Sequence, residues 1–347
     1  MTNTRSLCPT CYLEIPATTF DRDGAVWMAK TCPAHGDTEV MLDPSAAFWA
    51  AAQQPPGTHP DIAVFNNVTL ISITEHCNLA CHHCHRSPDN TTTDDATDFV
   101  VSQALGVPTP MVCLMGAEPT MRRDLPEIVT RVIAGGKWPL IYTNGIKLAD
   151  PEYFEEMHAS GLRLISVSIH ETQGPTVIKK AHKACLDATA AGWKLGNVSF
   201  TVSDVSTIEG ILEQIVALSS QGAAPRKFVI RGAARIGRAP SEDHSPYLSH
   251  MINEVAEACQ RRGYSIHLPH GFGNNPYRVI LTINGIEVAV VRWPTVETID
   301  MKWMNHRGPW TTFVPSSLTT AALGMIIRDG MMKGWYQGMR LSAGDRS

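Results

Sequence analysis

The sequence lacks the features that would direct a protein to a membrane or to nucleic acid. It contains no apolar run approaching the roughly 18 residues that a transmembrane helix needs. Cys8 and Pro9 stand where a signal peptide would need an apolar stretch. Its 29 basic residues are dispersed and are outnumbered by 33 acidic ones, which gives a formal net charge of −4. We therefore expect a cytoplasmic protein with no membrane span and no nucleic-acid partner.

The chain also lacks internal repeats and low-complexity stretches. With 347 residues, 44% of them hydrophobic, it can bury a substantial core. Residues 53–60 are predicted to be a linker, because Gln, Pro and Gly dominate them. We predict three parts: an N-terminal metal-binding module at residues 1–60, a core barrel at 61–240, and a C-terminal helix, β-hairpin and cap at 241–347.

Short β-rich runs alternate with amphipathic helical stretches through the middle of the chain. The expected strands are residues 68–74, 111–115, 140–143, 164–169, 198–202 and 227–231. The expected helices are residues 124–134, 151–160, 177–191, 208–220 and 246–262. The alternation implies parallel βαβ units and predicts an α/β fold: a partial (β/α)6 TIM-type barrel with its active site at the carboxyl ends of the strands. Asn284-Gly285 between two alternating runs predicts a hairpin of residues 278–283 and 286–291.

Cysteines are few, nine in all, and six of them fall in two tight groups. In a reducing compartment such groups indicate metal sites rather than disulfides. The groups are Cys8, Cys11 and Cys32, and Cys77, Cys81 and Cys84. The remaining thiols stand alone and are expected to be small buried hydrophobes: Cys113, Cys185 and Cys259.

The first group extends to a Cys3His site. Cys8 and Cys11 form one pair with a two-residue gap, and Cys32 and His35 form another about twenty residues later, a spacing typical of tetrahedral zinc ligands. We expect structural Zn(II) in a zinc-ribbon-like module, with rubredoxin-type Fe(II) as the alternative. In so small a module, metal binding supplies much of the folding free energy. A zinc ribbon can also bind nucleic acid, but the mixed charge around this one does not favour that function.

The second group forms a C-x3-C-x2-C loop directly after the first strand of the expected barrel. Two structural explanations exist: three buried thiols on one helical face, because the spacing is i, i+4, i+7, or a zinc site completed by a neighbouring histidine. A third explanation is an iron–sulfur cluster. Four irons held by three thiolates leave one iron without a protein ligand, and a small amino-carboxylate chelate fits such an open position.

This loop resembles the signature of the radical S-adenosylmethionine (SAM) superfamily. The resemblance implies that Cys77, Cys81 and Cys84 hold a [4Fe–4S] cluster whose open iron chelates SAM. It further implies reductive cleavage of SAM to a 5′-deoxyadenosyl radical that abstracts hydrogen from a small-molecule substrate, with flavodoxin or ferredoxin as the electron donor. Family members usually place an aromatic residue just before the third cysteine. His83 stands there, an imidazole that can still stack on adenine.

A second segment supports the resemblance. Gly116, Ala117 and Glu118, followed by Pro119, end the second expected strand. They resemble the family's Gly-Gly-Glu-Pro element, with alanine in place of the second glycine. Small residues let backbone carbonyls approach the SAM amine, and Glu118 adds negative charge nearby. Taken alone, the segment would more readily be explained as a strand-to-helix turn with a capping acid.

Polar residues end the third and fourth expected strands. Thr143 and Asn144 stand where the family has a polar strand terminus, so the resemblance implies contacts with SAM or substrate. By the same resemblance, Ser168 reaches the SAM ribose or carboxylate. Simple turn chemistry is the alternative for these residues.

Further residues of the expected site face the substrate. His170 and Glu171 stand where many family members place an acid or polar group, and we expect them to be catalytic. Arg231 opens an Arg-rich segment, and its guanidinium suits a carboxylate of SAM or of the substrate. The alternatives are a structural histidine and a solvated basic loop.

The metal module and the barrel together resemble one branch of the superfamily. It contains the class D methyltransferases, which take a carbon from methylenetetrahydrofolate-type donors, and the related tetraether synthases. The chain lacks the extra cysteines of an auxiliary-cluster domain and of tetraether synthases. C-methylation with a folate-type methylene donor is therefore the preferred reaction. The alternatives are another radical transformation of a small metabolite (dehydrogenation, epimerisation, rearrangement or C–C bond formation) and a non-catalytic iron–sulfur or zinc protein.

Overall fold

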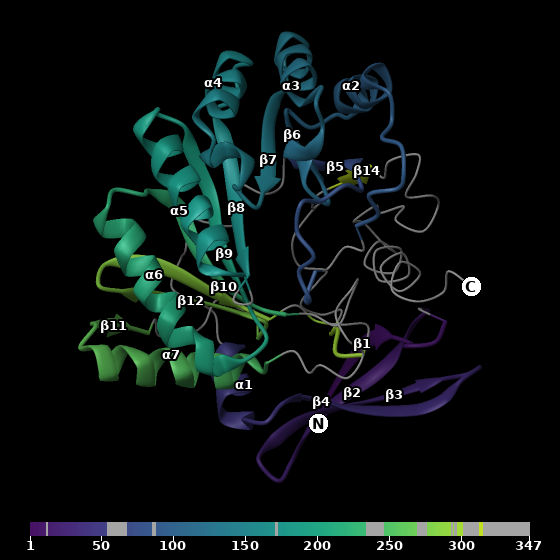
Figure 1. Ribbon diagram of the computed structural model, residues 1–347. Helices are drawn as coiled ribbons and strands as arrows, with labels where there is room; N and C mark the ends of the chain where they lie inside the picture. Colours follow the sequence, from purple (N-terminus) through teal and green to yellow (C-terminus); the bar gives the residue numbers. More distant parts are fainter. Residues whose placement is uncertain are drawn as a thin grey trace.

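The computed structural model contains two β-sheets, with helices packed on the larger one. A four-stranded sheet has the order β1-β2-β3-β4, and a ten-stranded sheet has the order β11-β12-β13-β10-β9-β8-β7-β6-β5-β14 (Figure 1). Among the described residues, no helix has the length and apolar character that a membrane span needs. The described residues are 1–11, 13–53, 68–84, 88–170, 173–233, 246–268, 276–292, 294, 297–300 and, as backbone only, 312–314.

The small sheet consists of consecutive antiparallel strands at the N-terminus. They are β1 (Thr2–Leu7), β2 (Glu14–Arg22), β3 (Ala25–Cys32) and β4 (Gly36–Asp43), followed by α1 (Ala46–Ala52). The module therefore has the β-strands expected of the predicted zinc-ribbon-like module. Its core includes Met28, Leu42 and Trp49, together with Tyr277 from the C-terminal part of the chain. The rings of Trp49 and Tyr277 meet edge to face at 5.7 Å.

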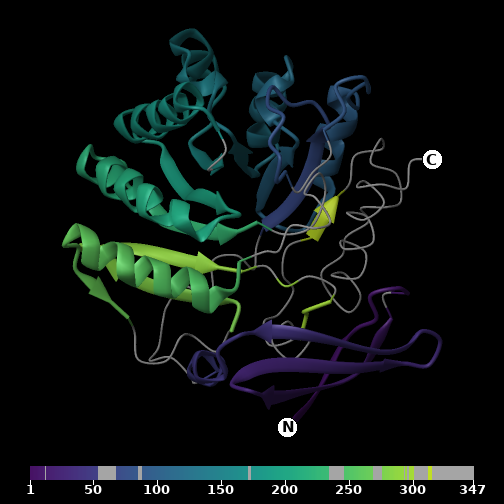
Figure 2. The same cartoon turned by 60° about the horizontal axis from the view of Figure 1, so that its bottom comes forward.

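Six parallel strands form the centre of the large sheet, as predicted. They are β5 (Val68–Thr74), β6 (Met111–Gly116), β7 (Trp138–Thr143), β8 (Leu164–His170), β9 (Lys194–Val202) and β10 (Pro225–Gly232). The helices between and after them are α2 (Thr97–Gly106), α3 (Leu125–Ala134), α4 (Pro151–Ala159), α5 (Pro175–Ala190), α6 (Ile208–Ser220) and α7 (Leu248–Arg262). The sheet curves into a partial barrel with these helices on its outer side (Figure 2).

Local sequence accounts for most helix positions but not for α2. Helix α4 begins at Pro151, and the Asp150 carboxylate accepts hydrogen bonds from the backbone amides of Glu152 and Tyr153 at 3.0 and 3.1 Å. Proline at the first position and aspartate at the cap are typical start signals. Helix α2 was not predicted because its apolar residues fall on both faces: Phe99 and Leu105 are 40% and 38% exposed.

The predicted hairpin is present, and it joins the large sheet. Its strands are β12 (Arg278–Ile283) and β13 (Ile286–Val291), and the turn residues Asn284 and Gly285 have φ angles of 48° and 78°. Strand β13 pairs in parallel with β10, so the hairpin covers an edge that would otherwise expose unpaired backbone groups. The short strands β11 (Ile266–His267) and β14 (Thr312–Val314) extend the sheet beyond β12 and β5.

Hydrogen bonds tie the small sheet to the C-terminal end of this hairpin. The Arg292 guanidinium, directly after β13, donates to the carbonyl of Leu42 in β4. The Ser6 hydroxyl of β1 donates to the carbonyl of Ile299 at 2.5 Å. Arg292 also donates its backbone amide to the carbonyl of Tyr277, at 2.9 Å. The N-terminal module is therefore packed against the end of the hairpin and held there by hydrogen bonds.

The two faces of the large sheet differ in chemistry. Residues facing the helices are apolar on every strand and include Leu114, Ile141, Val167, Phe200 and Ile230; burying each such side chain contributes about 1.5–3 kcal/mol. The opposite face lines the barrel lumen. On β5, β6 and β7 it is mainly apolar, with Leu70, Met111, Cys113, Met115, Leu140 and Tyr142. On β8, β9 and β10 strand alternation gives it polar residues: Ser166, Ser168, His170, Asn197, Ser199, Thr201, Lys227 and Arg231.

A glycine at the end of β6 permits a close approach between β6 and β5. Gly116 has a φ angle of 150°, and a Cβ at this position would lie 2.2 Å from the Thr74 carbonyl oxygen of β5. Because that atom belongs to a buried backbone, it cannot move aside easily.

We expect Gly116→Ala to lower the free energy of unfolding by about 3 kcal/mol, measured by denaturant titration. Gly210→Ala in α6 is the control: a Cβ there meets nothing within 4 Å, so this variant should be neutral or stabilised by up to about 1 kcal/mol. An equal loss in both would contradict the prediction.

Candidate active site and metal centres

Four residues of the small sheet converge on one point. Cys8 and Cys11 lie between β1 and β2, Cys32 ends β3, and His35 lies in the following turn. Their ligand atoms all lie within 4.8 Å of one another. His35 Nδ1 is 3.6 Å from Cys8 Sγ and 3.4 Å from Cys32 Sγ, and the thiols of Cys11 and Cys32 are 3.9 Å apart. This geometry fits the predicted tetrahedral Cys3His site.

The surroundings of this site favour a metal-binding thiolate. Burial raises the pKa of the Cys8 thiol, but hydrogen bonds from the backbone amides of Cys11 and Thr10 outweigh it and lower the pKa to about 6. The amide of Thr10 lies 3.4 Å from Cys8 Sγ. Cys8 is therefore largely deprotonated at neutral pH, which is the form that binds zinc.

Removing one of these ligands should release the metal from the small sheet alone. We expect Cys32→Ser to lose about one equivalent of zinc per chain and to lower the thermal midpoint, because metal binding stabilises so small a sheet. Elemental analysis of zinc and iron in the same sample measures both metals. Iron content should stay at the wild-type level, and Cys185→Ala in α5 should retain both metals. Full zinc retention in Cys32→Ser would contradict the assignment.

The second cysteine group lies in a loop at the carboxyl end of β5. The Asn90 side chain holds this loop: its Oδ1 accepts from the Cys77 amide at 2.9 Å, and its Nδ2 donates to the Cys77 carbonyl at 3.1 Å. His76 Nε2 lies 2.7 Å from the carbonyl of Thr92. The segment after the loop thus returns alongside it and fixes the backbone of the first cysteine.

The conformation of the loop argues against two of the structural explanations. Residues 75–84 form no helix and contain a single hydrogen-bonded turn from Cys81 to Cys84, so the three cysteines do not share a helical face. Cys77, Cys81 and Cys84 are half-buried, and they do not gather within single-ion distance as the four N-terminal ligands do. A cluster of four irons needs thiolates that are farther apart than one tetrahedral ion does. Burial, followed by the charges of Glu118 and the other two cysteines, raises the pKa of Cys77 to about 11, so a strongly cationic partner is needed to hold three thiolates here.

Backbone hydrogen bonds bring the segment after β6 to this loop. The Ala117 amide donates to the Thr74 carbonyl and the Glu118 amide to the His76 carbonyl, both at 2.9 Å. Gly116, Ala117 and Glu118 therefore run beside the start of the cysteine loop. The small side chains of the first two leave room for this contact.

The Glu118 carboxylate is buried and serves as a cap. It is 1% exposed and accepts hydrogen bonds from the hydroxyls of Thr120 and Thr143, at 2.6 and 2.7 Å, and from the amides of Thr120 and Asn144, at 3.1 and 2.7 Å. Burial, which outweighs these bonds, raises the pKa of Glu118. The capping explanation thus holds for this side chain, and its contact with a SAM amine stays a prediction.

The end of β7 closes a circuit back to the cysteine loop. Asn144 Nδ2 donates to Asn78 Oδ1 at 2.7 Å, and Asn78 follows Cys77 directly. Thr143 is occupied by Glu118 and by the amide of Gly145. Of the two predicted residues, Asn144 reaches the loop and Thr143 does not.

The end of β8 lies on the other side of the loop. Burial, then the charges of Arg231 and His83, lower the pKa of His170 to about 4, so its imidazole is neutral at neutral pH. Its Nδ1 is buried and has no hydrogen-bond partner among the described residues. Gln173 Nε2 lies 3.8 Å from Cys81 Sγ. His170 thus lies within electrostatic reach of Arg231 and His83, and Gln173, three residues later, contacts the thiol of Cys81.

For the remaining predicted residues, Ser168 and Glu171, no contact with the cysteine loop is described. Ser168 faces the lumen one row below His170, and no described hydrogen bond ties it to the loop. Glu171 falls outside the described residues.

Sequence reasoning missed Asn78, Asn90 and Gln173. Asn78 lies inside the cysteine motif, which is a usable signal, whereas nothing in the local pattern distinguishes the other two.

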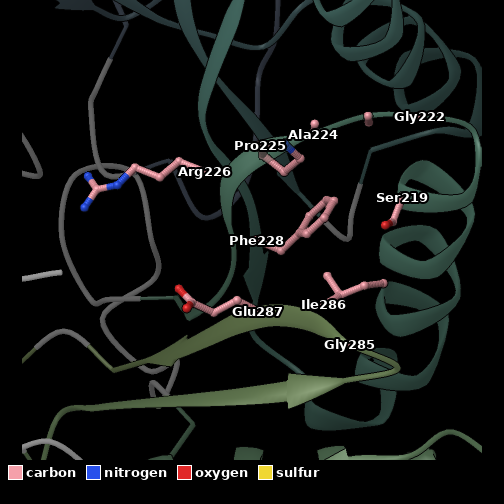
Figure 3. A pocket seen from close by; sticks show the side chains of 10 residues that line it. Ser219, Gly222, Ala224, Pro225, Arg226, Phe228, Gly285, Ile286 and Glu287 are labelled. Atoms are coloured by element: carbon pink, nitrogen blue, oxygen red, sulfur yellow. The ribbon is translucent and has the colours of Figure 1, made fainter. Parts of the chain in front are cut away.

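A surface depression of about 420 Å³ lies at the opposite end of the strands (Figure 3). It is bordered by the end of α6, the start of β10 and the turn between β12 and β13, and Phe228 and Ile286 point into it. It has no thiol or imidazole among its lining residues. The chemistry-bearing groups gather at the carboxyl ends of the strands, so the depression is not part of the candidate site.

Two family models match the chain. The radical SAM superfamily matches residues 71–185, and the HMPTM N-terminal zinc ribbon domain matches residues 1–43. Of the solved structures, Streptococcus suis SuiB bound to S-adenosylmethionine is similar with a TM-score of 0.50 at 10% identity, covering 96% of this chain and 88% of SuiB. At this identity the likeness concerns the fold.

Several curated proteins are similar over part of their length. The chain is 27% identical over 190 residues to the 7,8-dihydro-6-hydroxymethylpterin dimethyltransferase of Methanocaldococcus jannaschii, covering 47% of this chain and 38% of that protein. It is 28% identical over 130 residues to the Fe-coproporphyrin III synthase of Methanosarcina barkeri (36% and 32% covered). It is 29% identical over 163 residues to the probable GTP 3′,8-cyclase of Sulfolobus acidocaldarius (43% and 51% covered). The matches thus span about a third to a half of these relatives.

The parallel sheet and the cysteine loop, together with the family match, define a radical SAM domain. The chain contains a radical SAM domain at residues 71–185 and an N-terminal zinc ribbon domain at residues 1–43. The predicted superfamily and fold class are therefore confirmed. The domain implies a [4Fe–4S] cluster with SAM, and the three thiols of the loop fit that cluster.

Asn90 offers a test of how the loop is held. We expect Asn90→Ala to load less iron and to lose its cluster absorbance faster on exposure to air, because the two bonds that order the Cys77 backbone are gone, at a cost of about 1–3 kcal/mol. Thr91→Ala is the matched control. Among the described residues, the Thr91 hydroxyl bonds only to the Asp89 carboxylate, so cluster loading should stay unchanged. Equal loading in both variants would show that Asn90 does not position the cysteine.

Proposed function

We propose that this chain cleaves SAM reductively and abstracts hydrogen from a small-molecule substrate. The observation that carries the proposal is the backbone pairing of Ala117 with Thr74 and of Glu118 with His76, which sets the small-residue segment beside the cysteine loop. When bound, a [4Fe–4S] cluster and SAM supply a 5′-deoxyadenosyl radical, formed together with methionine when one electron from a flavodoxin- or ferredoxin-type donor cleaves SAM. The substrate then approaches from the lumen, where the carboxyl ends of the strands meet.

In this proposal the chain's own residues bind and orient the reactants. The thiolates of the loop ligate the cluster, and the imidazole of His83, 8% exposed, stacks on the adenine ring. The backbone around Gly116 and Ala117 approaches the amine of SAM. His170 is neutral, because burial foremost lowers its pKa to about 4. It therefore orients the substrate through hydrogen bonds without adding a charge beside Arg231.

The reaction we propose is C-methylation of a small molecule, with a methylenetetrahydrofolate-type compound as the carbon donor. The zinc ribbon match and the similarity to a pterin dimethyltransferase support this choice. Relatives named as a cyclase and as a coproporphyrin synthase support a second candidate, another radical transformation such as C–C bond formation or dehydrogenation. The two differ in whether a folate-type donor is required.

The first test is SAM cleavage by the reconstituted, dithionite-reduced protein under anaerobic conditions. We expect 5′-deoxyadenosine to form with the wild type and with Cys259→Ala, whose thiol is buried in α7. With Cys81→Ala formation should fall to background, because one cluster ligand is lost. If the wild type binds iron but cleaves no SAM with any reductant, the chain is a non-catalytic iron–sulfur protein and the proposal is wrong.

Isotope transfer then separates the reactions. Deuterium moving from a labelled substrate into 5′-deoxyadenosine supports hydrogen abstraction. A product that gains a methyl group only when methylenetetrahydrofolate is present supports methylation. Turnover of the substrate without that donor would instead favour the second candidate.

A further inference from the structure

One row of residues crosses five strands at the carboxyl end of the large sheet. Its members pair in succession: His170 with Thr201, Thr201 with Arg231, Arg231 with Val291, and Val291 with Arg278. Residues paired directly across neighbouring strands point to the same face of a sheet. We call this set the carboxyl-end row. It exists because β13 joins β10 and so carries Arg278 to the same level as Arg231.

The carboxyl-end row faces the lumen and not the helices. On each of the five strands a residue next to the row position belongs to the apolar layer beneath the helices: Ile169, Phe200, Ile230, Val290 and Val279. Strand alternation therefore sends the side chains of the row inward. The Nε atoms of Arg231 and Arg278 are buried there.

The row carries two guanidinium groups and no carboxylate. Four residues back along β10, Lys227 is paired with Glu287 of β13 at 3.1 Å, so that cation already has a carboxylate beside it. Among the described residues of the row, the charged side chains are Arg231 and Arg278. Neighbouring strands lie about 4.8 Å apart, so the two backbones are separated by about 10 Å. Two arginine side chains at that separation reach one group between them.

The neighbouring groups respond to this charge and leave acceptors and donors for a ligand. After burial, the charge of Arg231 is the next cause that lowers the pKa of His170, and the charge of Arg278 is the next that lowers the pKa of Lys227. Ser199 lies one row below Thr201. Its Oγ is buried, and like Nδ1 of His170 it has no hydrogen-bond partner among the described residues. Polar atoms of this kind are normally satisfied, so their place on the same face of the sheet as Arg231 and Arg278 indicates a ligand site.

We propose that Arg231 and Arg278 bind an anionic group of the substrate, a carboxylate or a phosphate, with Thr201 and His170 contributing hydrogen bonds. The substrate is therefore acidic, and it lies with its charged end against β10 and β12. This inference rests on the proposed function for the identity of the ligand as substrate. The carboxylate of SAM is the competing source of the same chemistry, and it would engage Arg231 from the cysteine loop without needing Arg278.

Anion binding to the reconstituted holoenzyme tests the proposal. Inorganic phosphate and succinate are titrated separately by calorimetry at one low ionic strength, because salt screens such contacts. We expect at least one of them to bind the wild type, and Arg231→Gln and Arg278→Gln each to weaken it by at least about tenfold. Arg278→Lys should recover part of the affinity. Arg226→Gln removes the same charge five residues earlier on β10 and should change the affinity by less than about twofold.

Three outcomes would overturn the proposal. The first is the absence of phosphate and succinate binding to a wild type that binds SAM, and the second is equal anion binding by Arg278→Gln and the wild type. The third is loss of SAM affinity in Arg278→Gln in parallel with loss of the anion, which would assign the pair to the SAM carboxylate. Unfolding curves of each variant show that the fold is retained. Because anion binding needs no SAM cleavage, a failure of the proposed reaction is seen separately from a failure of this site.

Discussion

The close pairing of the ends of β5 and β6 is the constraint on which the site depends. Gly116 lets the backbone of Ala117 reach Thr74, and the next amide then bonds to the cysteine loop. From there Glu118 extends the contact to the end of β7, and Asn144 returns it to the loop. Three strand ends and the loop therefore form a closed circuit of hydrogen bonds. A reactive cluster needs such rigidity, because a small displacement of a reacting group is costly for rate.

The lumen has two walls of different character. Leucine and methionine side chains line the part formed by β5, β6 and β7, whereas serine, threonine, lysine and arginine line the part formed by β8, β9 and β10. A molecule in this space is oriented by its own polarity. Its charged end is drawn to the arginines, and its apolar part is turned toward the cysteine side, where unwanted polar reactions of a radical are fewer.

Much of this architecture follows from local sequence, and the remainder depends on contacts between distant segments. The six parallel strands are readable because alternation and turn residues mark each one, and the Cys3His site is readable from spacing alone. Helix α2 is not predicted, because its exposed Phe99 and Leu105 place apolar residues on the solvent face and weaken the helical hydrophobic pattern. The hairpin is evident from Asn284-Gly285, but its pairing with β10 is not, so the level shared by Arg231 and Arg278 has no local signal. The capping role of Glu118 likewise depends on Thr143 and Asn144, which belong to another strand.

The docking of the zinc ribbon on the hairpin connects two distant binding sites, the zinc site of the ribbon and the proposed anion site in the lumen. Leu42 of the ribbon accepts from Arg292, Arg292 bonds to Tyr277, and Tyr277 precedes Arg278 in the chain. Ordering of the ribbon by zinc would therefore also favour an ordered strand end at Arg278. Linkage is reciprocal, so an anion bound in the lumen tightens the hold on zinc by the same factor. The supply of a structural metal would thereby be connected to the affinity for the proposed anionic substrate.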